Sequence, residues 1–123
     1  MAVDEVRQRF PEHAIDAVGD GQGGSYIVIH GVDIGDHYVQ AESWLGFHIS
    51  FQYPAADVYP HYVRPDLMRR DSQPLPAGLA ATTWVHGNQP VIQVSRRSNR
   101  WDPARDTASL KALRVIDWLR TTT

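Results

Sequence analysis

The spacing of prolines between residues 54 and 76 is the feature that most limits what this chain can fold into. Five of its eight prolines fall in this stretch, at positions 54, 60, 65, 74 and 76. Proline has no backbone N–H and disrupts a helix interior, so only a short extended piece fits here, at residues 59–63. Apolar anchors such as Val58, Leu67 and Leu75 are not typical of a flexible linker. The sequence therefore predicts an ordered proline-rich loop.

Alternating side chains predict a strand immediately before this loop, over residues 45–53. One face carries only apolar and aromatic residues: Leu45, Phe47, Ile49, Phe51 and Tyr53. The other face carries small and polar ones, which is the pattern of a sheet with one buried face. A further strand is expected at residues 25–30, followed by a turn or bulge at 31–36. Residues 82–85 and 90–94 are predicted to form a hairpin around residues 86–89.

Helices are predicted at both ends of the chain. Residues 3–10 have apolar positions at helical spacing, and residues 12–18 are expected to add a second turn or a short extension. A longer helix is predicted to begin after a cap at Asp106 or Thr107 and to run to about Arg120. Its apolar residues form a broad face, whereas the charged residues recur every three positions on the other side: Lys111, Arg114, Asp117 and Arg120.

This order of elements predicts a single α+β domain over residues 1–123. It would consist of an N-terminal helix, an antiparallel β-meander of about four strands, the proline-rich loop and a C-terminal packing helix. No repeat or domain boundary interrupts it.

Composition excludes several classes of protein. The chain contains no cysteine, which rules out disulfides, cysteine-ligated metals and a thiol nucleophile. Its formal net charge is −2, so no overall basic field would attract nucleic acid. Its apolar runs are too short to span a bilayer, and acids stand near the start where a signal peptide would be basic. A cytoplasmic protein without membrane attachment is expected.

Several motifs in this order resemble the ubiquitin-conjugating (UBC) fold. They are an aromatic-Pro pair at Tyr53-Pro54 with a second at Tyr59-Pro60, the segment His86-Gly87-Asn88, and the turn Trp101-Asp102-Pro103 leading into the last helix. The Leu75-Pro76 pair and the Ser-Arg-rich stretch before Trp101 are similar to those of divergent bacterial members from ubiquitin-like conjugation operons. The resemblance extends over most of the chain.

The resemblance implies an active site that this chain lacks in part. In the family, a cysteine several residues beyond a His-Pro-Asn segment carries a ubiquitin-like protein as a thioester, and the asparagine supports the oxyanion. Here glycine replaces the proline, and the position of the cysteine falls near residues 93–98, where Ser95 is the candidate that could form an ester. An alcohol needs an adjacent general base, so Ser95 also fits an ordinary strand-end residue. His86 and Asn88 fit either relic helpers or a plain hairpin turn.

Two explanations of the missing thiol remain open. The chain is either a pseudoenzyme that binds a ubiquitin-like protein or an activating enzyme, or a conjugating enzyme whose catalytic cysteine has been replaced. Neither requires a cofactor.

Two further groups are candidates for binding. Arg96, Arg97 and Arg100 beside Trp101 could hold an acidic protein partner or contact phosphates, or form a solvated loop over a buried tryptophan. A small domain that binds anions or nucleic acid through this loop is therefore a third functional hypothesis. Three tyrosines around the proline loop could form a peptide groove or seal the loop against the sheet: Tyr53, Tyr59 and Tyr62.

Metal binding and hydrolase chemistry find little support in the sequence. The six histidines are isolated from one another, although His30, Asp36 and His37 could meet across a hairpin. A Gly-x-Ser-x-Gly elbow is missing. We therefore expect no metal.

Overall fold

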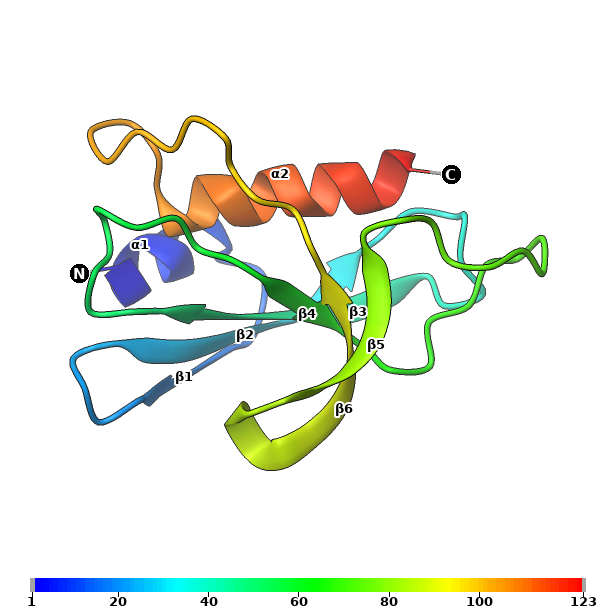
Figure 1. Cartoon of the computed structure of the whole chain (residues 1–123), viewed down its shortest axis with the longest axis horizontal. Coiled ribbons are helices and arrows are strands. Elements are labelled where there is room, and N and C mark those ends of the chain that lie inside the picture. Colours follow the sequence, from blue (N-terminus) through cyan, green and yellow to red (C-terminus); the bar gives the residue numbers. More distant parts are fainter. Residues whose placement is uncertain (1, 123) are drawn as a thin grey trace.

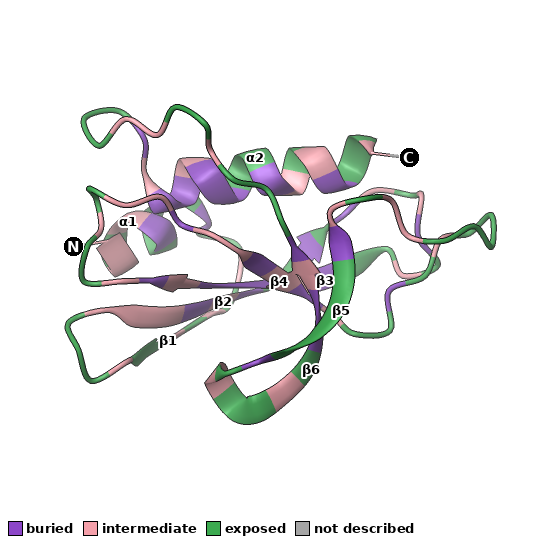
Figure 2. Cartoon of the chain, viewed as in Figure 1, coloured by how far each residue is buried: buried purple, intermediate pink, exposed green. Residues whose placement is uncertain are grey.

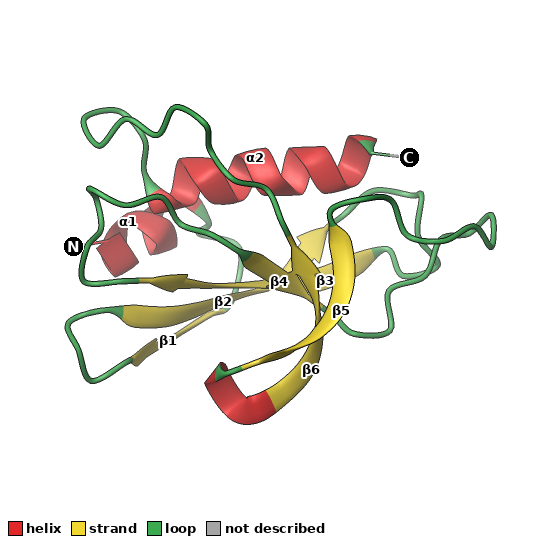
Figure 3. Cartoon of the chain, viewed as in Figure 1, coloured by secondary structure: helices red, strands yellow, loops and turns green. Residues whose placement is uncertain are grey.

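The computed structural model describes residues 2–122, which form two α-helices and one antiparallel sheet of six strands (Figure 1). The α+β class predicted from the sequence is confirmed. The strands follow the order β1-β2-β3-β4-β6-β5 across the sheet. The elements are α1 (Ala2–Arg9), β1 (Ile15–Gly19), β2 (Ser25–Asp33), β3 (Glu42–Ile49), β4 (His61–Val63), β5 (Leu79–Trp84), a 3-10 turn η1 (His86–Asn88), β6 (Gln89–Val94) and α2 (Ala108–Thr121). Long loops join β3 to β4, β4 to β5, and β6 to α2 (Figure 3).

The hydrophobic core lies between α2 and one face of the sheet (Figure 2). Alternate residues of β2 and β3 point into it, including Ile27, Leu45 and Phe47. From α2, Ala112 and Leu119 complete it. Alternation with period two therefore buries one face of each central strand, as the sequence pattern predicts.

Aromatic side chains cover the opposite face of the sheet. Trp84 stacks on Tyr62 with the ring centroids 4.7 Å apart, and on Trp44 at 6.1 Å. A Cβ atom at Gly46 would lie only 2.6 Å from the Trp84 ring. The Trp84 ring therefore occupies the space that a side chain at position 46 would fill.

The sheet has six strands rather than the predicted four. Residues 12–18 do not extend the first helix: Ile15–Gly19 pair antiparallel with β2 as an edge strand. Ile15 and Ala17 pack against the core, whereas Asp16 and Val18 are exposed. This short alternation beside Pro11 favours a strand, because proline prevents the helix from continuing. The predicted hairpin also joins the same sheet as β5 and β6.

The strand predicted at residues 45–53 begins earlier and ends at Ile49. The backbone N–H of Tyr53 donates to the carbonyl of Ser50 at 3.1 Å, so the chain turns there. Phe51 is consequently 66% exposed instead of facing the core. The turn or bulge predicted at residues 31–36 is present only at its start: the register between β2 and β3 shifts between Ile29 and Val32, and β2 then continues to Asp33.

Helix α2 begins at a predicted cap but places one charged residue unexpectedly. The side chain of Thr107 accepts a hydrogen bond from the backbone N–H of Leu110, at 3.2 Å. Lys111, predicted on the outer face, is instead buried, because Asp57 provides a carboxylate partner for its ammonium group.

Candidate functional site

Ser95 follows β6 directly. Its backbone N–H donates to the carbonyl of Gly78 at 2.8 Å, and its hydroxyl accepts a hydrogen bond from Gln93 at 3.1 Å. Hydrogen bonding with Ser95, and to a smaller extent with Arg97, lowers the pKa of the Tyr59 hydroxyl. Within residues 2–122, no hydrogen bond joins the Ser95 hydroxyl to a histidine or a carboxylate. Ser95 therefore has no histidine or carboxylate as a hydrogen-bonded general base in this arrangement.

His86 and Asn88 lie at the opposite end of the β5–β6 hairpin from Ser95. Trp84 pairs with Gln89 next to the hairpin turn, whereas Leu79 pairs with Val94 at its base. The length of β6 therefore puts about 20 Å between the turn and Ser95, since a strand rises about 3.3 Å per residue. The structure does not bring the three predicted catalytic positions together.

His86 and Asn88 each have a structural role in the turn. The His86 ring stacks on Tyr26 with the centroids 4.4 Å apart. Asn88 has φ +46° and Gly87 has φ +75°, so both adopt the left-handed backbone that this tight turn requires. In this position they form the connection between β5 and β6.

Two arginines of the predicted cluster lie over aromatic rings. The guanidinium of Arg96 lies 4.9 Å from the ring centre of Trp118 in α2, and that of Arg97 lies 4.4 Å from the ring centre of Tyr59. Such contacts favour a cation over the negative face of the ring. Arg100 is exposed. Arg96 therefore contacts α2, and Arg97 contacts the proline-rich loop.

Trp101 closes the segment against the proline-rich loop. Its indole N–H donates to the carbonyl of Pro54 at 2.7 Å, and its ring is partly buried against the core. The backbone N–H of Ala108 donates to the hydroxyl of Tyr53 at 3.1 Å. Tyr53 and Trp101 thus fasten the loop to the start of α2.

The three predicted tyrosines do not line one groove. Tyr53 contacts the start of α2, Tyr59 lies beneath Arg97, and Tyr62 stacks on Trp84 on the outer face of the sheet. Tyr53 therefore holds the loop to α2 and the core, whereas one of the two alternatives from the sequence was sealing against the sheet.

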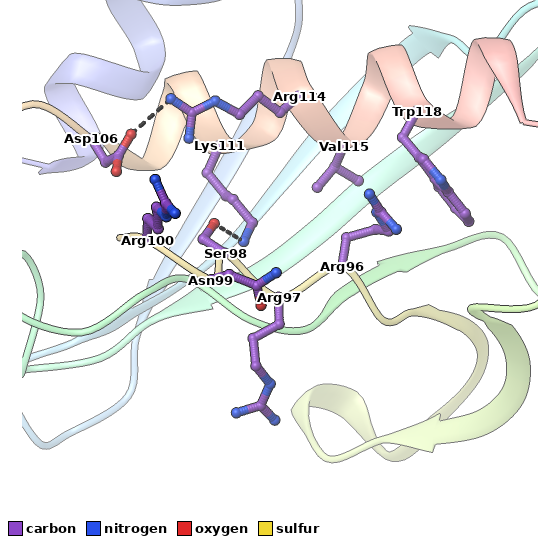
Figure 4. A pocket seen from close by; sticks show the side chains of 10 residues that line it. All are labelled: Arg96, Arg97, Ser98, Asn99, Arg100, Asp106, Lys111, Arg114, Val115 and Trp118. Atoms are coloured by element: carbon purple, nitrogen blue, oxygen red, sulfur yellow. Dashed lines mark hydrogen bonds and ion pairs between the residues drawn. The ribbon is translucent and has the colours of Figure 1, made fainter. Parts of the chain in front are cut away.

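A basic pocket lies between residues 96–100 and α2 (Figure 4). We call it the basic pocket below. It is lined by five cationic side chains and one acidic one: Arg96, Arg97, Arg100, Lys111, Arg114 and Asp106. The apolar part of its wall comes from Val115 and Trp118. Positive charge is therefore concentrated here, although the whole chain has a net charge of −2.

Comparison of the chain with protein-family models, with curated protein sequences and with solved structures finds no match in any of the three. What can be said of this site therefore rests on its own residues.

The floor of the basic pocket holds a buried ion pair that sequence reasoning missed. The ammonium group of Lys111 donates to both carboxylate oxygens of Asp57, at 3.0 and 2.9 Å, and also hydrogen-bonds to the hydroxyl of Ser98. The backbone N–H of Ser98 donates to the same carboxylate at 2.8 Å. Lys111 is the only lysine among the twelve lysine and arginine residues of the chain. This was the only sign in the sequence that position 111 differs from the arginines.

Arg114 forms the rim of the pocket on the helix side. Its guanidinium donates to Asp106 at 2.7 Å, while its side chain stays 56% exposed. A hydrogen bond from the Asp102 backbone, and next the one from Arg114, lowers the pKa of the Asp106 carboxyl. Asp106 is therefore ionised at neutral pH, and part of the Arg114 guanidinium remains available for another anion.

The histidines do not form a metal centre in the part of the chain that the structure describes. No group of three or more histidine, aspartate or glutamate side chains comes together within residues 2–122. His30 pairs with Asp16 at 2.8 Å instead of meeting Asp36 and His37. Neither helix of the described chain is long and apolar enough to cross a bilayer.

Proposed function

We propose that this chain is a cytoplasmic, non-catalytic member of the UBC-like proteins, which binds a ubiquitin-like protein or its activating enzyme in a conjugation pathway. The observation that carries the proposal is the basic pocket, formed beside a strand end that has no thiol. Five cationic side chains line this pocket, and Ser95 next to it is hydrogen-bonded to no histidine or carboxylate. Such a site can bind a protein partner, whereas Ser95 lacks the histidine or carboxylate that would activate its hydroxyl for acyl transfer.

The order of elements supports the family part of the proposal. An N-terminal helix precedes an antiparallel sheet, and a C-terminal helix packs on one sheet face after a proline-rich loop. The residues that carry the resemblance to the UBC fold also have structural contacts here, since Tyr53 and Trp101 both fasten that loop to the start of α2.

Photocrosslinking in cells tests the choice of partner. A photoreactive amino acid replaces Asn99, an exposed uncharged residue that lines the pocket, and a control variant carries it at Arg70, which is exposed on the loop before β5. The cells also express a ubiquitin-like protein and its activating enzyme from the same pathway. We expect a crosslink to one of these two proteins from position 99 only, identified by mass spectrometry. Crosslinks to nucleic acid, or equal products from both positions, would overturn the proposal.

The variant Ser95→Cys tests the absence of catalysis. It is incubated with the same activating enzyme, ATP and ubiquitin-like protein. We expect no adduct that a reducing agent releases, because the structure places His86 and Asn88 at the far end of the hairpin from Ser95. A reducible adduct at position 95 would instead favour a conjugating enzyme whose cysteine has been replaced.

A further inference from the structure

The basic pocket contains guanidinium groups without a carboxylate partner. Within residues 2–122, Arg96, Arg97 and Arg100 form no ion pair, whereas Arg64, Arg69 and Arg114 each do. In Figure 4 the side chain of Arg97 extends away from α2, but the other cations surround the space between the segment and the helix. The pocket therefore offers Arg96 and Arg100, together with the exposed part of Arg114, to an anion.

The nearby aromatic rings favour an acidic peptide over a nucleic acid. Binding to single-stranded nucleic acid usually combines cations with free aromatic faces on which bases stack. Here Arg96 covers a face of Trp118 and Arg97 covers a face of Tyr59. Trp101 is fixed to Pro54 and partly buried. The rings beside the cations are thus already in use, whereas guanidinium groups remain to bind carboxylates in a bidentate manner.

The buried ion pair below the pocket holds this arrangement in place. Asp57 accepts hydrogen bonds from the ammonium group of Lys111 and from the backbone N–H of Ser98, in the middle of the segment. Lys111 itself is almost fully buried, so it does not reach a ligand. A segment fixed before binding loses little further conformational freedom when a ligand arrives. Lys111 is therefore a positioning residue for the arginines.

We infer that the basic pocket binds an acidic segment of a protein, with side-chain or terminal carboxylates held by Arg96, Arg100 and Arg114. The inference names the chemistry of the contact, and only the identity of the partner rests on the proposed function. The overall charge of −2 would repel an acidic partner at long range, so the attraction is confined to the pocket. Apolar contact with Val115 and Trp118 would accompany the ion pairs.

A synthetic peptide tests this inference directly. The probe is an N-acetylated peptide of eight alternating Asp and Glu residues, titrated into the ¹⁵N-labelled chain at low salt. We expect shifts of the backbone signals of Ser98 and Asn99, and of the indole signal of Trp118. Arg100→Glu should weaken binding by about tenfold or more, because it removes one contact and adds a repulsion. Arg100→Lys keeps the charge without the planar fork and should weaken binding by about threefold.

Arg70→Glu is the matched control, since it makes the same charge change at an exposed position outside the pocket. We expect it to change the affinity by less than twofold. The inference is overturned if the peptide leaves the pocket signals unchanged, if both Glu variants lose affinity equally, or if an oligothymidine of twelve nucleotides binds more tightly than the peptide.

The outcome separates this inference from the proposed function. Peptide binding at the pocket without a crosslink to a ubiquitin-like protein or its activating enzyme would support the inference and reject the proposed partner. A crosslink from position 99 without peptide binding would support the partner and reject acidic-segment recognition.

Discussion

The ammonium group of Lys111 lies 2.9 Å from the carboxylate of Asp57, and the lysine side chain is only 3% exposed. The pair connects α2 to the loop between β3 and β4, across 54 residues of sequence. The same carboxylate accepts the backbone N–H of Ser98, so it also holds the segment that lines the basic pocket. One buried carboxylate thus links the stability of the fold to the shape of the candidate site.

Replacing Lys111 by methionine should lower the free energy of unfolding by about 3 kcal/mol, because it leaves the carboxylate of Asp57 largely buried without its cation. Urea denaturation followed by circular dichroism measures this loss. The double variant Lys111→Met with Asp57→Leu should recover much of it, since both charges are then removed together. A loss below about 1 kcal/mol for the single variant would contradict a structural role for the pair.

This pair also marks the limit of what the sequence could predict in α2. The helix, its cap at Thr107 and most of its apolar face follow from local patterns. The same patterns predict Lys111 on the outer face, because charged residues are rarely buried unless they are paired. Its partner, Asp57, lies 54 residues away, and no sequence pattern around Asp57 indicates the pairing. Only the tertiary structure reveals it. Positions 108, 111 and 115 nevertheless share a helical face, which the charge at 111 obscured.

The candidate site, too, could be predicted only in part from the sequence. The sequence shows a basic run at Arg96, Arg97 and Arg100. The pocket also includes Arg114 and Trp118, which belong to α2 and come next to this run only in the folded chain. The separation of Ser95 from the turn could have been deduced, because a hairpin turning at residues 86–89 places its two ends a full strand apart. The short strand β1 was missed because its alternation covers only five residues.

Thr107→Ala should reduce the free energy of unfolding by about 1 kcal/mol, because the side chain that accepts the backbone N–H of Leu110 is lost. Thr107→Ser is the control, since it retains the hydroxyl and should stay within about 0.5 kcal/mol of the parent chain. Thermal and urea denaturation of the three proteins provide the comparison. Equal stability of the alanine and serine variants would show that the cap contributes nothing.

Gly46→Ala should destabilise the fold by about 1–3 kcal/mol, because the new methyl group would lie 2.6 Å from Trp84 and 3.1 Å from Trp44. The near-ultraviolet circular dichroism of the aromatic cluster should change as well, since the stacked tryptophans must move apart. Gly19→Ala is the matched control: an added Cβ there meets no atom within 4 Å. If both variants behave alike, the packing of Trp84 over Gly46 is not as described.

His61→Leu should flatten the pH dependence of stability between about pH 5 and 6.5. Burial first, and the positive charge of Lys111 second, lowers the pKa of His61 from 6.5 to about 3. Between these two values the unfolded chain binds more protons than the folded one, so the free energy of unfolding falls as the pH decreases. Above pH 6.5 protonation of His61 has no effect on stability. Below that pH it lowers the free energy of unfolding by up to about 1.4 kcal/mol per pH unit.

Neither ring nitrogen of His61 has a hydrogen-bond partner among the described residues, so an apolar side chain of similar size should also raise stability at pH 5. Urea denaturation at half-unit steps from pH 7 to pH 5 measures both effects. This range avoids most of the titration of aspartates that hydrogen-bond in the folded state, such as Asp20 and Asp106, whose pKa values are lowered from 3.8. An unchanged slope in His61→Leu would mean that another group causes the acid sensitivity.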